Sequence, residues 1–510
     1  MLLTCPSHDK DTINGVSKID TPPKKTSVQE RQRWITDRAW VTGLIGAISV
    51  FLIAAVYSYT NIFQQGLILW GISINGRHAL SLFALFIIIV MMVSCEIVRL
   101  VQFYSRTGKS YLSLSPLLYQ KKYFQLILSS IVLWGGYLLL LQCVIALYHT
   151  ANEYGYKNAA DYYQVWFFFL EILWKMVLWA GLPYVLITRS FQHNPHGDQK
   201  DLAVWLVKLC GLLLFLLLKL FKNDKGFRFI SLSAAHHVVY YLTFQASLKW
   251  NQQDNVLMRG LVVKLFFAPL MTVFFNDQFY HLVSNIDYLT QLVPKLLTGA
   301  FYSHAQLNQD VFNISVSAIF SIDVALAWCG YVVSMRWLDN QNHSVEPSML
   351  GWLVCLCCYP PFQMIQGFYY SVPSDKMIFQ FDHQMIISVL IVLMVLSYVV
   401  YMISTLMFGV RFSNLTHRGI IRTGPYAWVR HPAYASKNFA WWCIMCPIIV
   451  LNISTTGFGL AIIQMVGLVM QSTLYYLRAI TEEKHLSQDP LYREYCKRVP
   501  NRFIPQLHLK

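Results

Sequence analysis

A basic, polar segment lies between two hydrophobic runs near the end of the chain, at residues 411–438, and reads RFSNLTHRGIIRTGPYAWVRHPAYASKN. Gly424 and Pro425 predict a turn within it, because glycine accepts a positive φ and proline fixes its own φ. Pro432 predicts the start of a helix, a position where the missing proline N–H costs nothing. Such a helix would direct free N–H groups and the positive end of its dipole toward Arg430, which suits an anion. The segment therefore predicts a site for a small, partly anionic ligand at a membrane surface.

A second polar piece, residues 478–486, continues the last hydrophobic run beyond the membrane. Its Arg478 and Glu482 are four residues apart and therefore share one face of a helix. Only residues 452–456 separate the two hydrophobic runs that join the polar pieces, which predicts a helical hairpin with both pieces close together at its base. The proline-containing tail at 492–505 is expected to fold back over them as a lid.

The order of short motifs in this region resembles a known family. The motifs are Gly-Pro-Tyr at 424–426, Arg-His-Pro-x-Tyr at 430–434, a helical hairpin, Arg-x-x-x-Glu-Glu-x-x-Leu at 478–486, and later Tyr-x-x-Tyr, Val-Pro and Ile-Pro pairs. Together they resemble the isoprenylcysteine carboxyl methyltransferases and their phospholipid methyltransferase relatives, over residues 385–505. The resemblance implies an integral membrane enzyme that uses S-adenosyl-L-methionine to methylate a lipidic or prenylated substrate, at a carboxylate or an amine.

By resemblance, one arginine is catalytic and ten residues line the cofactor pocket. The arginine is Arg478, which in that family faces the substrate carboxylate. The cofactor-binding positions are Arg418, Gly419, Ile420, Ile421, Tyr426, His431, Pro432, Ala433, Tyr434 and Glu482. The sequence departs from the family at Arg418, where a histidine is frequent, and at 435–438, where a glycine is frequent. These departures leave the methyl acceptor open.

The residue types also suit this cofactor on chemical grounds. S-adenosylmethionine carries a carboxylate, a sulfonium cation, a ribose diol and an adenine. Helix N–H groups at Pro432 and the His431 side chain suit the carboxylate, and the Tyr426 and Tyr434 rings can attract a sulfonium by about 0.5–2 kcal/mol. Methyl transfer needs alignment more than acid–base assistance. A carboxylate acceptor is already ionised at neutral pH, whereas an amine must first lose a proton, to His431 or Glu483.

The composition places these motifs in a membrane protein. The chain has 510 residues, of which 56% are hydrophobic and 13% charged, and its mean hydropathy is +0.44. A soluble protein contains about 25% charged residues. The net charge of +15 raises the question of nucleic acid, but the basic residues gather in short loops between apolar runs, which is the positive-inside pattern. We therefore expect membrane lipids and a lipidic or prenylated substrate as partners, and no nucleic acid.

Apolar runs of spanning length predict an all-α, polytopic membrane fold with about 10–12 transmembrane helices. The clear runs lie at about 40–59, 79–103, 124–148, 163–188, 202–222, 312–334, 348–371, 383–410, 439–454 and 457–477. Three further runs, at 228–248, 256–275 and 278–299, contain proline or charged residues. They predict either two spans or re-entrant or interfacial helices.

The distribution of lysine and arginine predicts that both termini face the cytosol. It places the tail at 1–38, the loop at 411–437 and everything after residue 477 on that side. We expect residues 39–380 to form a multi-helix membrane region whose role the sequence does not define, and residues 381–510 to form a methyltransferase-like catalytic domain. The expected location is the bacterial inner membrane or the endoplasmic reticulum.

Three features have competing explanations. The arginines around the motifs can be positive-inside anchors or contacts to lipid headgroups. Cys355, Cys357 and Cys358 lie in a hydrophobic run with no histidine nearby, so we expect buried free thiols and no metal site. Asp323 falls in the middle of a span, which predicts either a substrate-binding role or a structural pair with Lys264 or a backbone group.

Two alternative functions fit parts of the sequence. Sterol-type membrane reductases, which use NADPH, share an Arg-His-Pro-x-Tyr element and a Tyr-Cys-x-x-Val-Pro ending, and residues 495–500 match that ending. The adjacent Glu482 and Glu483 favour methyl transfer over reduction. The charged residues within the spans, such as Asp323 and Glu171, also suggest a transporter or lipid-handling scaffold with an inactive enzyme-like domain.

Overall fold

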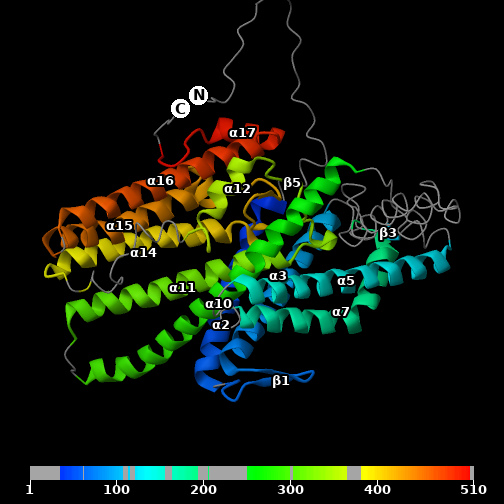
Figure 1. Ribbon diagram of the computed structural model, residues 1–510, viewed down its shortest axis with the longest axis horizontal. Coiled ribbons are helices and arrows are strands. Elements are labelled where there is room, and N and C mark those ends of the chain that lie inside the picture. Colours follow the sequence, from blue (N-terminus) through cyan, green and yellow to red (C-terminus); the bar gives the residue numbers. More distant parts are fainter. Residues whose placement is uncertain are drawn as a thin grey trace, which may run out of the picture.

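The computed structural model describes residues 35–60, 62–106, 113–114, 121–155, 163–192, 205, 250–298, 302–363, 379, 381–455 and 457–505. Helices dominate these residues (Figure 1). The long ones are α2 (Ala39–Thr60), α3 (Gly76–Arg106), α5 (Tyr123–Gly155), α7 (Gln164–Ser190), α10 (Gln252–Leu297), α11 (His304–Val332), α14 (Gln384–Leu406), α15 (Pro432–Thr455) and α16 (Phe458–Leu486). The short ones are α12 (Met349–Leu356), α17 (Pro490–Arg498) and the 3-10 helices η1 (Arg336–Leu338), η3 (Gly409–Arg411) and η4 (Gly424–Ala427).

The described strands are very short and form three antiparallel pairs. These are β1 (Leu67–Leu69) with β2 (Ile72–Ile74), β3 (Ser113–Leu114) with β4 (Phe191–Gln192), and β5 (Ser344–Val345) with β6 (Thr416–His417). Within the described ranges, nine helices are long and apolar enough to cross a membrane. The predicted all-α, polytopic membrane fold is therefore confirmed. The predicted runs at 202–222 and 228–248 lie outside the described residues, apart from Trp205.

The runs predicted as separate segments at 256–275 and 278–299 form one continuous helix, α10, of 46 residues. A capping box fixes its start, because Asn251 Oδ1 accepts from the Asp254 amide at 3.0 Å and Asp254 Oδ2 accepts from the Asn251 amide at 2.8 Å. Pro269 lies inside α10 without ending it. A helix of this length extends about 69 Å, roughly twice the hydrocarbon thickness of a bilayer, so α10 must tilt or project beyond the membrane.

The run at 348–371 does not form a single spanning helix. In the structure α12 starts after the Ser348 N-cap, whose side chain accepts from the Gly351 amide, and it ends at Leu356 after eight residues. Turns continue to residue 363. Pro360 and Pro361 follow the helix closely, and a proline lacks the N–H that a helix interior needs while it disfavours a helical residue before it. Hydropathy alone therefore overestimated the length of this helix.

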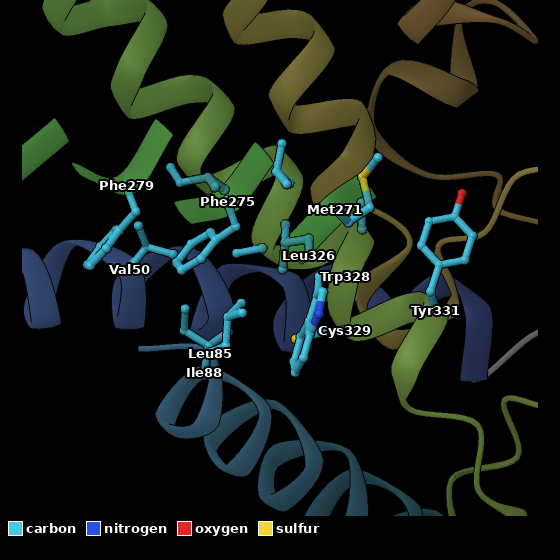
Figure 2. Packing of buried hydrophobic residues seen from close by; sticks show 14 of the residues in the cluster. Val50, Leu85, Ile88, Met271, Phe275, Phe279, Leu326, Trp328, Cys329 and Tyr331 are labelled. Atoms are coloured by element: carbon cyan, nitrogen blue, oxygen red, sulfur yellow. The ribbon is translucent and has the colours of Figure 1, made fainter. Parts of the chain in front are cut away.

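The main hydrophobic core lies where α2, α3, α10 and α11 cross (Figure 2). Figure 2 shows Val50 of α2, Ile88 of α3, Phe275 of α10 and Trp328 of α11 directed toward one another. The Trp328 ring is also hydrogen-bonded inside the core, because its Nε1–H donates to the Thr272 hydroxyl at 2.9 Å. Satisfying this indole group removes the cost of burying it in an apolar environment.

A second layer is formed by α14, α15 and α16, which lie side by side in Figure 1 with α11 next to them. Ile391 of α14, Ile448 of α15 and Leu468 of α16 belong to its shared core. The link between α15 and α16 is short and includes Gly457, whose φ of +99° is accessible to glycine at little cost. The hairpin predicted from the sequence is present.

The two layers are joined by close backbone contact and by buried charge. A Cβ atom on Gly43 of α2 would lie 2.1 Å from the Leu406 carbonyl oxygen at the end of α14, so only glycine permits this approach. Nearby, the fully buried Glu96 of α3 accepts from Arg99 at 2.5 Å and from Arg411 of η3 at 2.7 Å. Removing one partner of such a buried group would leave an uncompensated charge, so the network fixes η3 against the N-terminal helices.

Candidate functional site

A cavity of about 150 Å³ opens where the end of α14, the start of α15 and the end of α16 meet. The loop between α14 and α15 supplies much of its lining, and η4 and the polar end of α16 supply more. Residues before the loop also contribute, because Glu346, Cys355 and Tyr359 line the same cavity. The two polar pieces of the C-terminal region therefore meet in one site, and an earlier part of the chain completes its wall.

Glycines and a short β-ladder shape the loop around this cavity. Gly419 and Gly424 have φ angles of +116° and +62°, which residues with a Cβ rarely adopt. Strand β6 of the loop pairs with β5, and the Glu346 amide donates to the Leu415 carbonyl at 2.8 Å. These backbone bonds hold the loop against the segment that follows α11.

Most of the residues assigned by resemblance lie around the cavity. Those in its lining are Arg418, Gly419, Tyr426, His431, Ala433, Tyr434, Arg478 and Glu482. Ile420 and Ile421 point elsewhere: Ile420 packs in a core with Leu491 and Tyr492, and Ile421 packs against Ala39 and Tyr426. Pro432 is buried as the first residue of α15. The side chains of these three residues therefore position the loop and the helix, and they do not line the cavity.

Tyr434 lies at the centre of the cavity wall. Its hydroxyl donates to Glu482 Oε2 at 2.7 Å, and the ring stacks on His431 with 5.4 Å between centroids. The Arg478 guanidinium lies 4.9 Å from the centre of the Tyr434 ring. The ring therefore already attracts a protein cation, which leaves Tyr426 as the freer of the two tyrosines expected to face a sulfonium.

Arg478 is buried and has no carboxylate partner among the described residues. One of its nitrogens donates to Asn414 Oδ1 at 3.1 Å, and its flat face rests on Tyr434. It forms no ion pair with Glu482, although the two are one helical turn apart. A buried guanidinium that lacks an opposite charge favours an anionic ligand with which it can form two parallel hydrogen bonds.

Glu483 faces away from this arrangement and binds the C-terminal tail. Its carboxylate accepts from Arg430 at 2.8 Å, from His431 at 3.1 Å and from both Nε and Nη2 of Arg502 at 3.1 and 2.9 Å. Burial alone would lower the pKa of Arg430, but the Glu483 charge outweighs it and raises that pKa. The hydrogen bond to Glu483 likewise raises the pKa of Arg502. Glu483 therefore acts as a structural centre, and the base role considered for it has no support in this geometry.

Backbone carbonyls of the tail also accept hydrogen bonds from the amides in front of α15. The Arg430 amide donates to the Asn501 carbonyl at 2.9 Å, and the His431 amide donates to the Arg502 carbonyl at 3.0 Å. The tail folds back as the sequence led us to expect. The two amides that it satisfies precede Pro432, so they are not the N–H groups of the first turn of α15 that the sequence suggested for an anion.

Arg418 is fully enclosed between the loop and α11. Its Nε donates to Asn342 Oδ1 at 2.7 Å and its Nη1 donates to the Gly330 carbonyl, while Nη2 has no hydrogen-bond partner among the described residues. Burial lowers the pKa of Arg418 to about 10. The neighbouring His417 imidazole is also buried, which lowers its pKa to about 3, with His343 and His485 adding to the effect. His417 is therefore neutral in the folded protein at physiological pH, although Asp489 lies 3.3 Å away.

Several lining residues were not found from the sequence. They include Glu346, His485, Tyr401 and Lys437. His485 follows Glu482 by three residues, so helical periodicity could have found it. No local pattern marks Glu346, which lies far from the motifs in the sequence.

Asp323 is linked to the cavity through two lining residues, Tyr401 and Thr405, and the pair suggested with Lys264 does not form. Its carboxylate accepts from the Tyr401 hydroxyl at 2.8 Å and from the Thr405 hydroxyl at 2.6 Å. The Lys437 ammonium lies 4.9 Å from the centre of the Tyr401 ring. The expected structural network for Asp323 is present, and its partners come from α14.

Comparison with known protein families gives a match in the C-terminal part of the chain. No curated protein matches this chain, and no solved structure matches it. The family model described as isoprenylcysteine carboxyl methyltransferase (ICMT) family matches residues 385–488, which include α14, the loop, α15 and α16. The part of the chain that builds most of the cavity is therefore an ICMT-family domain.

Proposed function

We propose that this protein is a membrane methyltransferase that uses S-adenosyl-L-methionine to methylate a lipidic or prenylated acceptor at the membrane surface. The observation that carries the proposal is the single cavity in which the loop of the matched domain and the polar end of α16 meet. The match to a methyltransferase family favours methyl transfer over the reductase and scaffold alternatives.

The residues of the cavity fit the cofactor. The Glu482 side chain is 41% exposed although its neighbours are buried, and one of its oxygens is held by Tyr434. It is thus fixed in place and still accessible to an amine or ribose hydroxyl. Tyr426 offers an aromatic ring to a cation. The Phe408 ring packs edge-on against it, with 5.5 Å between the ring centroids. When bound, S-adenosylmethionine would supply the electrophilic methyl group.

Arg478 is proposed to orient the acceptor. It lies one turn before Glu482, nearer to the apolar part of α16, where the polar head of a lipidic substrate would approach. Its hydrogen bond to Asn414 and its cation–π contact with the Tyr434 ring restrain the guanidinium. Fixing both reactants supplies most of what a methyl displacement needs, because the reaction depends on alignment.

Two measurements test the proposal, one on the purified full-length protein and one on lipids from cells that express it. We expect S-adenosylhomocysteine to raise the melting temperature more than NADPH does, because only the former matches the cavity chemistry. We also expect a labelled methyl group to pass from S-adenosylmethionine into a lipid extract of expressing cells. A larger stabilisation by NADPH, together with no label transfer, would refute methyl transfer and restore the reductase alternative.

A further inference from the structure

Glu346 is a cavity residue outside the matched domain, and its backbone position is tightly fixed. It follows β5, whose pairing with β6 ties it to the loop, and its amide donates to the Leu415 carbonyl at 2.8 Å. Its side chain lies against the start of α12, where a Cβ atom on Gly351 would come within 2.6 Å of the Glu346 Cδ atom. The carboxylate is therefore held by packing on one side and faces the cavity on the other.

One of the two carboxylate oxygens is committed and the other is not. Glu346 Oε1 accepts from the Ser348 amide at 2.9 Å and from the Ser348 hydroxyl at 2.6 Å. Oε2 has no hydrogen bond within the described part of the chain, and His485 Nδ1 lies 3.7 Å from it. The residue is only 4% exposed. An oxygen that has no protein donor and lies in the lining of the cavity is open to a donor from a ligand.

The surroundings make this corner of the cavity acidic. His485 lies within electrostatic range of both Glu346 and Glu482, and its Nε2 is engaged by the Ser344 hydroxyl at 2.8 Å. Arg259 is also near His485, but it forms no ion pair with Glu346 among the residues described. Arg478 also lines this cavity, without a carboxylate partner among the described residues. The cavity therefore offers both carboxylates and an uncommitted guanidinium to a ligand.

We infer that Glu346 binds an ammonium group of the ligand that fills this cavity. The inference rests on the proposed function, and it adds a binding residue from the part of the chain before the matched domain. An ammonium supplies N–H donors and a positive charge, and charge-assisted hydrogen bonds are about twice as strong as neutral ones. Two sources have this chemistry: the amino group of the cofactor and the amino group of an amine acceptor.

The test compares the isosteric Glu346→Gln variant with the full-length wild-type protein. Glutamine can keep both bonds to Ser348 and removes the charge that faces the cavity. Gly351→Ala is the second variant, because its Cβ must displace the Glu346 carboxylate. Glu494→Gln is the matched control, since Glu494 lies on the surface of α17 in an exposed pair with Arg498. Melting temperatures show whether each variant folds.

Binding is measured by calorimetry with two probes. S-adenosylhomocysteine carries the ammonium, and 5′-methylthioadenosine lacks the amino-acid part. If the cofactor supplies the ammonium, Glu346→Gln and Gly351→Ala should weaken the binding of S-adenosylhomocysteine by about tenfold or more. The binding of methylthioadenosine should stay unchanged. If the acceptor supplies it, S-adenosylhomocysteine affinity stays the same, and methyl transfer to phosphatidylethanolamine vesicles falls while transfer to N-acetyl-S-farnesylcysteine persists.

Other outcomes overturn the inference. Unchanged binding and transfer in folded Glu346→Gln would show that Glu346 only supports α12, and equal weakening of both nucleoside probes would show a general loss of shape. If the wild-type protein binds no S-adenosylhomocysteine and transfers no methyl group, the proposed function fails before any variant is compared, and the assignment of Glu346 falls with it.

Discussion

Arg478 and Glu482 show how two charged residues one helical turn apart come to have separate surroundings. Arg478 contacts the face of the Tyr434 ring, and Glu482 accepts a hydrogen bond from the Tyr434 hydroxyl. No ion pair joins Arg478 to Glu482. Tyr434 therefore separates the charges and holds each toward the cavity. Because the two groups do not neutralise each other, each remains available to a ligand group of opposite sign.

The first prediction contrasts substitutions at these two positions. Arg478→Lys should leave S-adenosylhomocysteine affinity nearly unchanged and lower kcat by about tenfold or more, because lysine cannot form the planar two-bond contact that aligns an anionic acceptor. Glu482→Gln should instead weaken the binding of S-adenosylhomocysteine by about 1–2 kcal/mol. Calorimetry and turnover of both variants separate the effects. Equal loss of cofactor binding in both would show that Arg478 is part of the cofactor site.

The second prediction concerns acid. His417 is neutral in the fold because burial lowers its pKa to about 3, whereas an unfolded histidine titrates near 6.5. Below pH 6.5 the unfolded chain therefore gains a proton that the folded chain does not, and stability falls as the pH falls. Between pH 6.5 and 5 this one group should remove about 2 kcal/mol. Melting temperatures across this range should fall less steeply for His417→Gln, and parallel curves would contradict the assignment.

Residues close in the sequence were predicted well, and residues brought in by the fold were missed. Tyr434, Arg478 and Glu482 belong to motifs within the matched domain, and they lie together in the structure. Glu346 reaches the same cavity, and Asn342 reaches Arg418, through the segment that the β5–β6 ladder holds in place. A two-residue strand has no recognisable hydrophobic pattern, so its pairing, and the site residues it positions, could not be derived from the sequence.

At the scale of elements, length and hydropathy identified the helices, while proline effects depended on context. Pro269 lies within α10 and leaves the helix continuous, whereas the pair at Pro360 and Pro361 follows a helix of only eight residues. Neighbouring helices satisfy the groups that a membrane proline frees, and the sequence does not show which neighbours are present. Helix existence was therefore predictable and helix boundaries were not.

The third prediction tests the tail as an element. Arg502 is joined to Glu483 by two hydrogen bonds, and its carbonyl accepts from the His431 amide. Arg502→Gln should release the tail, because it removes a two-bond, charge-assisted contact in which each bond to the charged group contributes roughly 1.5–3 kcal/mol. Hydrogen exchange at the His431 amide should become faster. Arg498→Gln, which breaks an exposed pair with Glu494, should not change it. Equal exchange in the two variants would show that Glu483 does not hold the tail.

At the scale of the whole molecule, helix ends from distant parts of the sequence gather around the cavity. Asp37, before α2, binds Arg422 of the loop at 2.8 Å, and Gly330 near the end of α11 accepts from Arg418. At the other end, Asn308 near the start of α11 donates to the Gln384 carbonyl at the start of α14 at 3.1 Å. The end of α11 therefore lies near the cavity, and its start lies beside the start of α14.

This arrangement leads to the last prediction, that the cavity faces the cytosol and the β1–β2 hairpin faces the other side. The loop and tail are rich in arginine, which favours the cytosolic side of a membrane. The α15–α16 hairpin returns both pieces to the same side. Ile68 in the β1–β2 hairpin is 76% exposed, and the Arg498 side chain on α17 is 60% exposed, so both positions suit labelling. In intact cells, a membrane-impermeant maleimide should react with Ile68→Cys above the background of the unsubstituted protein, and with Arg498→Cys only after permeabilisation. Reaction of Arg498→Cys before permeabilisation would reverse the orientation and place the methyl donor site outside the cytosol.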